Sequence, residues 1–319
     1  MLARWSLRRA VQVLVPVLLG RAPVAAQQDS LPAGILLDEA VVVAQREGFD
    51  VAAFIARVRT DTTFRHAFLN LRVHPHRTEG ELRVHDPRDR ERAGFFRTAH
   101  LVRIQGADGA DRTVQVTDSV RETGRLRQPD GDHRYLTARM FESLFFPEGA
   151  RPVPRSVADL DGRRSGGSRF DRYRADLKRF MFSPGEELEV PIVGDKLALF
   201  DPDIARHYAM SIWSGVRNGH DCWVFSADMR PDAPRNAVVV RTMDTWFDKA
   251  SGQVIAREYR MQHAGLILRF DIAMVVDLDV RDGLLVPTHV HYDGDWDLPM
   301  QRRERVRFFL RTTQWEAWP

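Results

Sequence analysis

The chain has 319 residues, of which 44% are hydrophobic and 29% are charged, and it contains one cysteine. These values exclude a collagen-like chain, a wholly disordered chain and a small disulfide-stabilised scaffold. A chain of about 300 residues buries roughly three quarters of the surface that its unfolded form exposes, so its core needs no metal or disulfide. The formal net charge is +3.

The N-terminal residues have the pattern of a cleaved secretory signal. Three arginines precede the apolar run 11–19, and small residues follow it up to Ala26. The run is shorter than the ~20 apolar residues that span a bilayer. We therefore expect residues 1–26 to be a signal peptide, residues 27–319 to form a single domain, and the protein to be exported.

The positive charge belongs to this N-terminal segment. Its four arginines have no acidic neighbour there, and without them 43 basic residues face 44 acidic ones. Elsewhere acids and bases alternate along the chain, so nothing concentrates positive charge in the way that a nucleic-acid surface requires. We expect no nucleic-acid partner.

Helices and short strands are predicted in the first half of the chain. Asp38 and Asp50 each precede an apolar stripe with helical spacing, as N-cap residues do, and a third stripe begins at Phe64. A fourth helix is predicted over 135–146. Short strands are predicted at 81–85, 100–105 and 113–117.

The middle of the chain is rich in proline and glycine. Residues 147–168 are predicted to be a flexible insertion on this composition. Phe170, Tyr173 and Leu177 then share one face of a predicted helix. We expect this face to pack on the sheet that the last third of the chain forms.

The last third of the chain has an apolar period of two. Between Leu266 and Val280 every even-numbered residue is apolar, while the odd-numbered set includes several charged residues. This alternation predicts one long strand with a dry and a wet face. Neighbouring strands are predicted at 208–216, 221–227, 238–247, 254–261, 284–296 and 306–312. Short turns between them favour an antiparallel meander, and hence an α+β domain with helices against one face of a curled sheet.

The apolar face of this sheet is the main candidate for function. Its predicted wall residues are Phe270, Ile272, Met274, Trp296, Phe308 and Leu310. Helices could fill the face completely as an ordinary core, or could leave a cavity for an apolar ligand. In the second case Phe170, Tyr173 and Leu177 would face the ligand from the opposite side.

No short motif for nucleophilic, phosphate-binding or dinucleotide chemistry is present, and we expect no cofactor.

His289, His291 and Asp293 lie at positions i, i+2 and i+4 of a predicted strand, and such residues point to one face and could bind zinc. The same alternation also fits the wet face of a half-buried strand. His74 and His76 form a second such pair, and they are interpreted as part of a surface turn.

Several segments resemble a group of uncharacterised exported proteins of Bacteroidetes-type bacteria. These segments are 61–71, 193–196, 221–225, 245–249, 255–259, 292–296 and 303–308. The strand Asp221–Phe225 and the hairpin Trp246–Arg257 are also similar to periplasmic lipoprotein carriers and receptors of the LolA/LolB type. That resemblance implies an incomplete antiparallel β-barrel, wrapped around helices, that holds acyl chains inside.

Three functions are consistent with these observations. The leading hypothesis is a non-enzymatic protein of the periplasm, associated with the outer membrane, that binds a lipid or the acyl chain of a lipoprotein in an apolar half-barrel. The first alternative is a metal-assisted hydrolase that uses His289, His291 and Asp293. The second is a structural envelope scaffold with a filled core, whose loop 86–92 and residues Trp315 and Trp318 contact an envelope protein partner.

Overall fold

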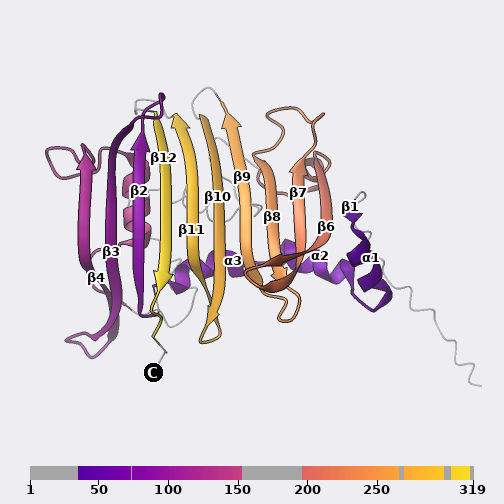
Figure 1. Cartoon of the computed structure of the whole chain (residues 1–319), viewed down its shortest axis with the longest axis horizontal. Coiled ribbons are helices and arrows are strands. Elements are labelled where there is room, and N and C mark those ends of the chain that lie inside the picture. The colour runs from indigo at the N-terminus through magenta and orange to yellow at the C-terminus, as the bar shows by residue number, and fades with distance from the viewer. Residues whose placement is uncertain (1–34, 73, 153–195, 266–268, 298–302, 317–319) are drawn as a thin grey trace, which may run out of the picture.

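The computed structural model of the chain describes residues 35–72, 74–152, 196–265, 269–297 and 303–316. These residues form one open sheet with helices on one side of it (Figure 1). The described helices are α1 (Glu39–Arg46), α2 (Val51–Thr60), α3 (Thr63–Asn70), α4 (Leu136–Phe145) and α6 (Pro202–Ala205). The described strands are β1 (Ile35–Leu37), β2 (His76–His85), β3 (Glu91–Gln105), β4 (Asp111–Gly124), β5 (Arg151–Pro152), β6 (Tyr208–Arg217), β7 (His220–Met229), β8 (Val240–Asp248), β9 (Val254–Ala264), β10 (Arg269–Arg281), β11 (Leu284–Asp297) and β12 (Glu304–Thr313).

The strand order shows how the two halves of the chain join. Within the described residues the sheet runs β1-β6-β7-β8-β9-β10-β11-β12-β2-β3-β4-β5. The strands β6 to β12 are a continuous antiparallel meander, as the sequence predicts. The last of them, β12, pairs antiparallel with β2, and β1 pairs in parallel with β6. The sheet is therefore mixed, and the N-terminal part of the chain supplies both of its edges.

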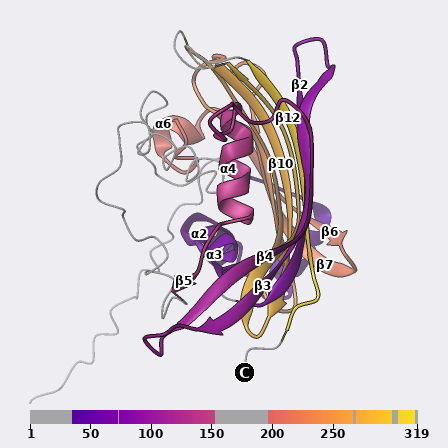
Figure 2. The same cartoon turned by 90° about the vertical axis from the view of Figure 1, so that its left-hand side faces the viewer.

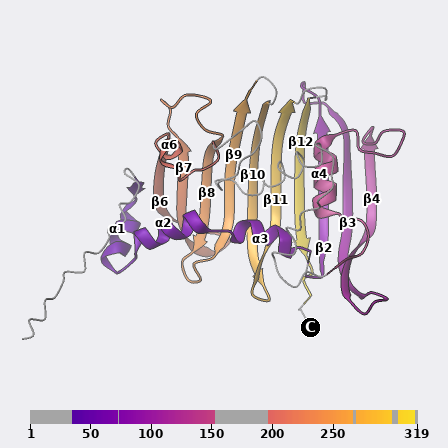
Figure 3. The ribbon, with the colours of Figure 1, turned by 180° about the vertical axis from the view of Figure 1, so that it is seen from behind.

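The helices α2, α3, α4 and α6 lie on the concave side of the curved sheet (Figure 2). Seen from behind, α1, α2 and α3 form a row across the strands from β6 towards β2, while α4 runs along β2 and β12 (Figure 3). The prediction of a curled, incomplete barrel is confirmed in its coarse form. A sheet wrapped around helices is too strong a description, because the sheet stays open and the helices cover one face of it.

The alternation of β10 agrees with the sequence-based prediction up to Leu278, whereas Val280, which was predicted on the dry face, is 37% exposed. Phe270, Ile272, Met274 and Val276 are at most 1% exposed, whereas Asp271 and Asp277 are only partly buried. Leu266, where the predicted strand begins, lies outside the described residues. Side chains in the pleat point alternately to the two faces, so the buried set faces the helices.

The strands β2, β3 and β4 are much longer than predicted. The predicted core of β4 was 113–117, but the strand extends from Asp111 to Gly124. Its second half is exposed on both faces because β4 lies near the edge of the sheet, where none of the described helices covers it. A strand that is wet on both sides carries no apolar alternation, and so its length is invisible in the sequence pattern.

Side-chain caps tie the helices to the sheet. The Asp38 carboxylate accepts a hydrogen bond from Val41 N at 2.9 Å, as the N-cap of α1, and another from Ser214 N of β6 at 2.9 Å. Glu304 of β12 accepts hydrogen bonds from Leu136 N at 2.8 Å and from the Thr137 hydroxyl at 2.6 Å. The start of α4 is thus capped by a residue of the sheet and not by its own chain neighbours.

The described part of the chain contains no helix with the length and apolar character needed to cross a bilayer. The predicted insertion 147–168 and the predicted helix with Phe170, Tyr173 and Leu177 fall largely or wholly within residues 153–195, which lie outside the described residues.

Candidate functional site

The six described wall residues predicted from the sequence all lie in the hydrophobic core. Phe270, Ile272, Met274, Trp296, Phe308 and Leu310 are each at most 3% exposed. These six residues therefore belong to the buried apolar face of the sheet. Their role in binding a ligand stays a prediction.

Aromatic residues of two helices occupy much of this face. Phe141 of α4 stacks on Phe308 at 4.1 Å between ring centroids, and its edge contacts Tyr292 at 4.9 Å. Phe64 of α3 lies against Tyr259 at 6.3 Å. Along these strands the apolar face is therefore a packed core, which fills the space that an open half-barrel would leave for a ligand.

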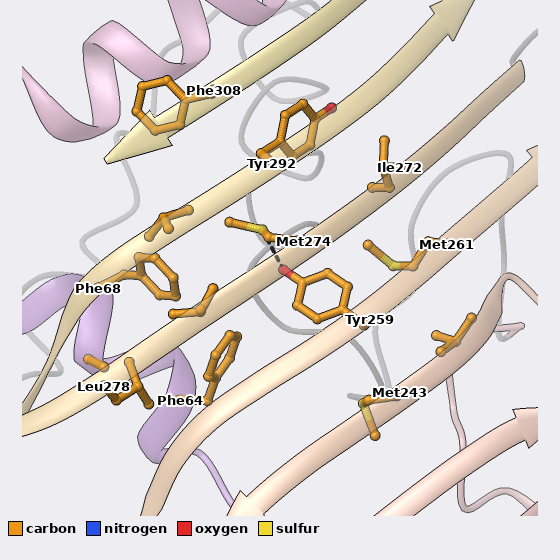
Figure 4. Packing of buried hydrophobic residues seen from close by; sticks show 14 of the residues in the cluster. Phe64, Phe68, Met243, Tyr259, Met261, Ile272, Met274, Leu278, Tyr292 and Phe308 are labelled. Carbon is orange, nitrogen blue, oxygen red and sulfur yellow. Dashed lines mark hydrogen bonds between the residues drawn. The ribbon is translucent and has the colours of Figure 1, made fainter. Parts of the chain in front are cut away.

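The centre of this core satisfies its few polar atoms internally (Figure 4). The Tyr259 hydroxyl donates to the Met274 sulfur at 2.7 Å, and the Trp296 indole donates to the Tyr292 hydroxyl. Burial raises the pKa of both tyrosines well above the ordinary value. Both phenols are neutral at physiological pH, and the charged group beside Tyr259 is Arg257, which is buried on the same face of β9.

A pocket lies at the end of the apolar face, between α4, the turn after α3, and the strands β2, β3, β4 and β12. Its volume is about 20 Å³, room for one small group. Its apolar walls are Leu71, Leu101, Leu144, Phe145, Pro147 and Leu310. Among the six described wall residues that the sequence predicted, only Leu310 borders this pocket.

Polar groups also line the pocket. Arg72, Thr78 and Arg151 contribute to its lining, together with the imidazole of His76. None of the described lining residues is acidic. Sequence analysis placed none of these residues at a pocket, since each is an isolated polar residue in a region with no motif, and only folding brings them together.

The histidine pair His74 and His76 is not a surface turn. Their exposed fractions are 2% and 5%, and the His76 ring stacks on Trp315 at 4.5 Å between centroids. The prediction was wrong because β12 and the residues that follow it lie over this turn, and nothing in the local sequence indicates that cover. Burial lowers the pKa of His76 to about 4.

We expect His76 to make the protein less stable in acid. The pKa of His76 is about 4 in the folded state, against 6.5 for an unperturbed imidazole in the unfolded chain. The unfolded chain therefore binds more protons than the folded one between these two pH values. Its contribution is therefore fully present above pH 6.5 and is lost as the pH falls towards 4, by on the order of 3 kcal/mol. Chemical denaturation of wild type and His76→Phe at pH 7 and pH 4 measures this. Equal losses in the two proteins would contradict it.

The proposed metal ligands do not converge. His289, His291 and Asp293 are exposed on the wet face of β11, opposite the helices. Among the described residues, no three His, Cys, Asp or Glu side chains form a group that could hold a metal ion. The period-two pattern placed the three residues on one face correctly, but a flat strand spaces them too widely to share one ion without residues from a neighbouring strand.

The comparisons with known proteins give structural similarity only. No protein-family model matches the chain, and no curated protein sequence matches it. A proposed outer membrane lipoprotein-sorting protein domain from Vibrio parahaemolyticus is 12% identical, with a TM-score of 0.26 over 82% of this chain and 90% of that one. A LolA superfamily protein from Nitrosomonas europaea is 11% identical, with a TM-score of 0.24 over 81% and 93% of the two chains. A DUF1329 family protein from Desulfovibrio piger is 10% identical, with a TM-score of 0.24 over 80% and 91%.

Proposed function

We propose that the chain is a non-enzymatic, exported protein of the cell envelope that binds a lipid or the acyl chain of a lipoprotein. Its place would be the periplasm, in association with the outer membrane. The observation that carries the proposal is the pocket at the end of the apolar face, where Leu144 and Leu310 line the same pocket as cationic side chains. The N-terminal signal pattern and the carrier-like hairpin Trp246–Arg257 support it.

The binding energy would come from burial of methylene groups. Each buried CH₂ is worth ~0.8 kcal/mol, so a few of them give measurable affinity without a polar anchor. The pocket of about 20 Å³ holds only one small group. Admission of a longer chain therefore requires Leu144 and Pro147, which are only partly buried, to move outward from the sheet.

Native mass spectrometry of protein purified gently from an envelope extract tests this function. We expect extra mass of phospholipid or acyl-chain size that solvent extraction removes. A bare polypeptide mass would contradict the proposal. It would favour the scaffold alternative, which the packing of Phe141 and Phe145 on Phe308 supports.

A variant of the pocket makes the test specific. Leu144→Gln places a polar amide at the apolar wall, and we expect the bound lipid fraction to fall several-fold because the burial of methylenes is lost. Leu144 is partly exposed, so the fold should survive. Val120→Gln is the matched control, since Val120 is 50% exposed on β4 and lies outside the pocket lining. Equal lipid loads in the two variants would exclude this pocket as the site.

A further inference from the structure

Two arginines from distant parts of the chain meet at the pocket. Arg72 lies in the turn after α3, and Arg151 lies in β5. The Thr113 hydroxyl of β4 donates to the Arg72 carbonyl at 3.1 Å, and Thr113 is also the register partner of Arg151. Thr113 of β4 therefore binds the backbone of Arg72 and pairs with Arg151, and both arginines line the pocket.

The charge of Arg72 is not balanced by the protein. Among the described residues no carboxylate forms an ion pair with Arg72 or shifts its pKa, and its Nε is buried without a hydrogen-bond partner. Burial, and then the nearby charge of Arg151, lower the pKa of Arg72. An arginine stays protonated in proteins, so this arrangement carries an electrostatic cost that a bound anion would remove.

A third donor points to the same conclusion. Thr78 of β2 is 2% exposed and lines the pocket, and its hydroxyl also has no hydrogen-bond partner. Buried polar atoms without partners are rare in folded proteins. Arg72 and Thr78 together offer an anion two unused donors, next to apolar walls formed by Leu144 and Leu310.

We infer that Arg72, Arg151 and Thr78 bind the anionic group, a phosphate or a carboxylate, of an amphiphile whose first carbons contact Leu144 and Leu310. This inference rests on the proposed lipid-binding function and adds the charge of the ligand. Guanidinium groups suit such an anion because their fork of N–H donors matches the geometry of phosphate and carboxylate oxygens.

Calorimetric titration of the purified protein with three probes tests the inference. The probes are decyl phosphate, used below its micellar concentration, decanol and inorganic phosphate. We expect decyl phosphate to bind about 10-fold or more tightly than decanol, because it adds charge-assisted hydrogen bonds. Arg72→Gln should remove most of this difference and leave the affinity for decanol unchanged, and Arg151→Gln should act in the same direction.

Control measurements separate binding from folding. Arg83→Gln removes an equal charge from β2, but Arg83 is exposed and paired with Glu81, so the affinity should not change. Since Arg72→Gln relieves a repulsion, we expect its melting temperature to equal or exceed that of the wild type. A large fall in melting temperature would show that Arg72 is structural, and would overturn the inference.

The remaining outcomes distinguish this inference from the proposed function. If decyl phosphate and decanol bind equally and Arg72→Gln affects neither, the lipid-binding function stands and the assignment of an anionic group is overturned. If only inorganic phosphate binds, and Arg72→Gln abolishes that binding, Arg72 and Arg151 form a site for free phosphate. That result would overturn both the inferred binding of an amphiphile and the proposed lipid-binding function.

Discussion

Replacement of Phe308 by alanine is expected to destabilise the fold by about 3–5 kcal/mol, the cost of removing a fully buried aromatic side chain. Phe308 is 1% exposed and stacks on Phe141 at 4.1 Å and on Phe145 at 5.3 Å. These contacts join the centre of the sheet to α4. The cavity left by the substitution would lie directly under that helix, and denaturant unfolding followed by circular dichroism measures the loss.

The neighbouring residue provides a matched control. Phe309 follows Phe308 in β12 but points to the other face, where it is 43% exposed. We expect Phe309→Ala to cost less than about 1 kcal/mol. Similar losses for the two variants would mean that α4 does not pack on β12 as described. If Phe308 is instead part of an open cavity, its alanine variant should lose little stability and should bind more lipid.

Replacement of Arg257 by methionine is expected to cost about 3–5 kcal/mol, because it leaves a buried carboxylate without its partner. Arg257 and Asp61 form an ion pair at 3.3 Å in which both side chains are 6% exposed. The guanidinium also lies over the Phe64 ring at 4.4 Å from its centroid and donates to the Thr245 hydroxyl at 3.1 Å. This residue of β9 therefore holds the junction of α2 and α3 on the sheet.

Two further variants show whether the buried charge causes the loss. Arg260→Met removes a cation from the same strand, but its pair with Asp271 is exposed, so we expect at most about 1 kcal/mol. The double variant Asp61→Asn with Arg257→Met should recover part of the stability, because no unpaired charge stays buried. A double variant as unstable as the sum of the two single ones would show that the two side chains do not interact.

The sequence by itself determined the features that depend on local periodicity. The alternation from Phe270 to Leu278 predicted which face of β10 is dry, and it placed His289 and His291 on the wet face of β11. The predicted N-caps Asp38 and Asp50 start α1 and α2, since both carboxylates accept backbone hydrogen bonds there. A pleat or a helical turn repeats over a few residues, so its pattern can be read from neighbouring residues alone.

Only the tertiary structure decided how these elements meet. The pairing of β12 with β2 joins the C-terminal meander to the N-terminal strands, and Glu304 of β12 caps α4 across more than 160 residues of sequence. The approach of Arg72 to Arg151 depends in the same way on the position of β4. Such contacts arise from the path of the chain between elements, and isolated polar residues carry no periodic signal that would reveal their partners. For this reason the apolar face could be predicted from the sequence, whereas the charged side of the pocket could not.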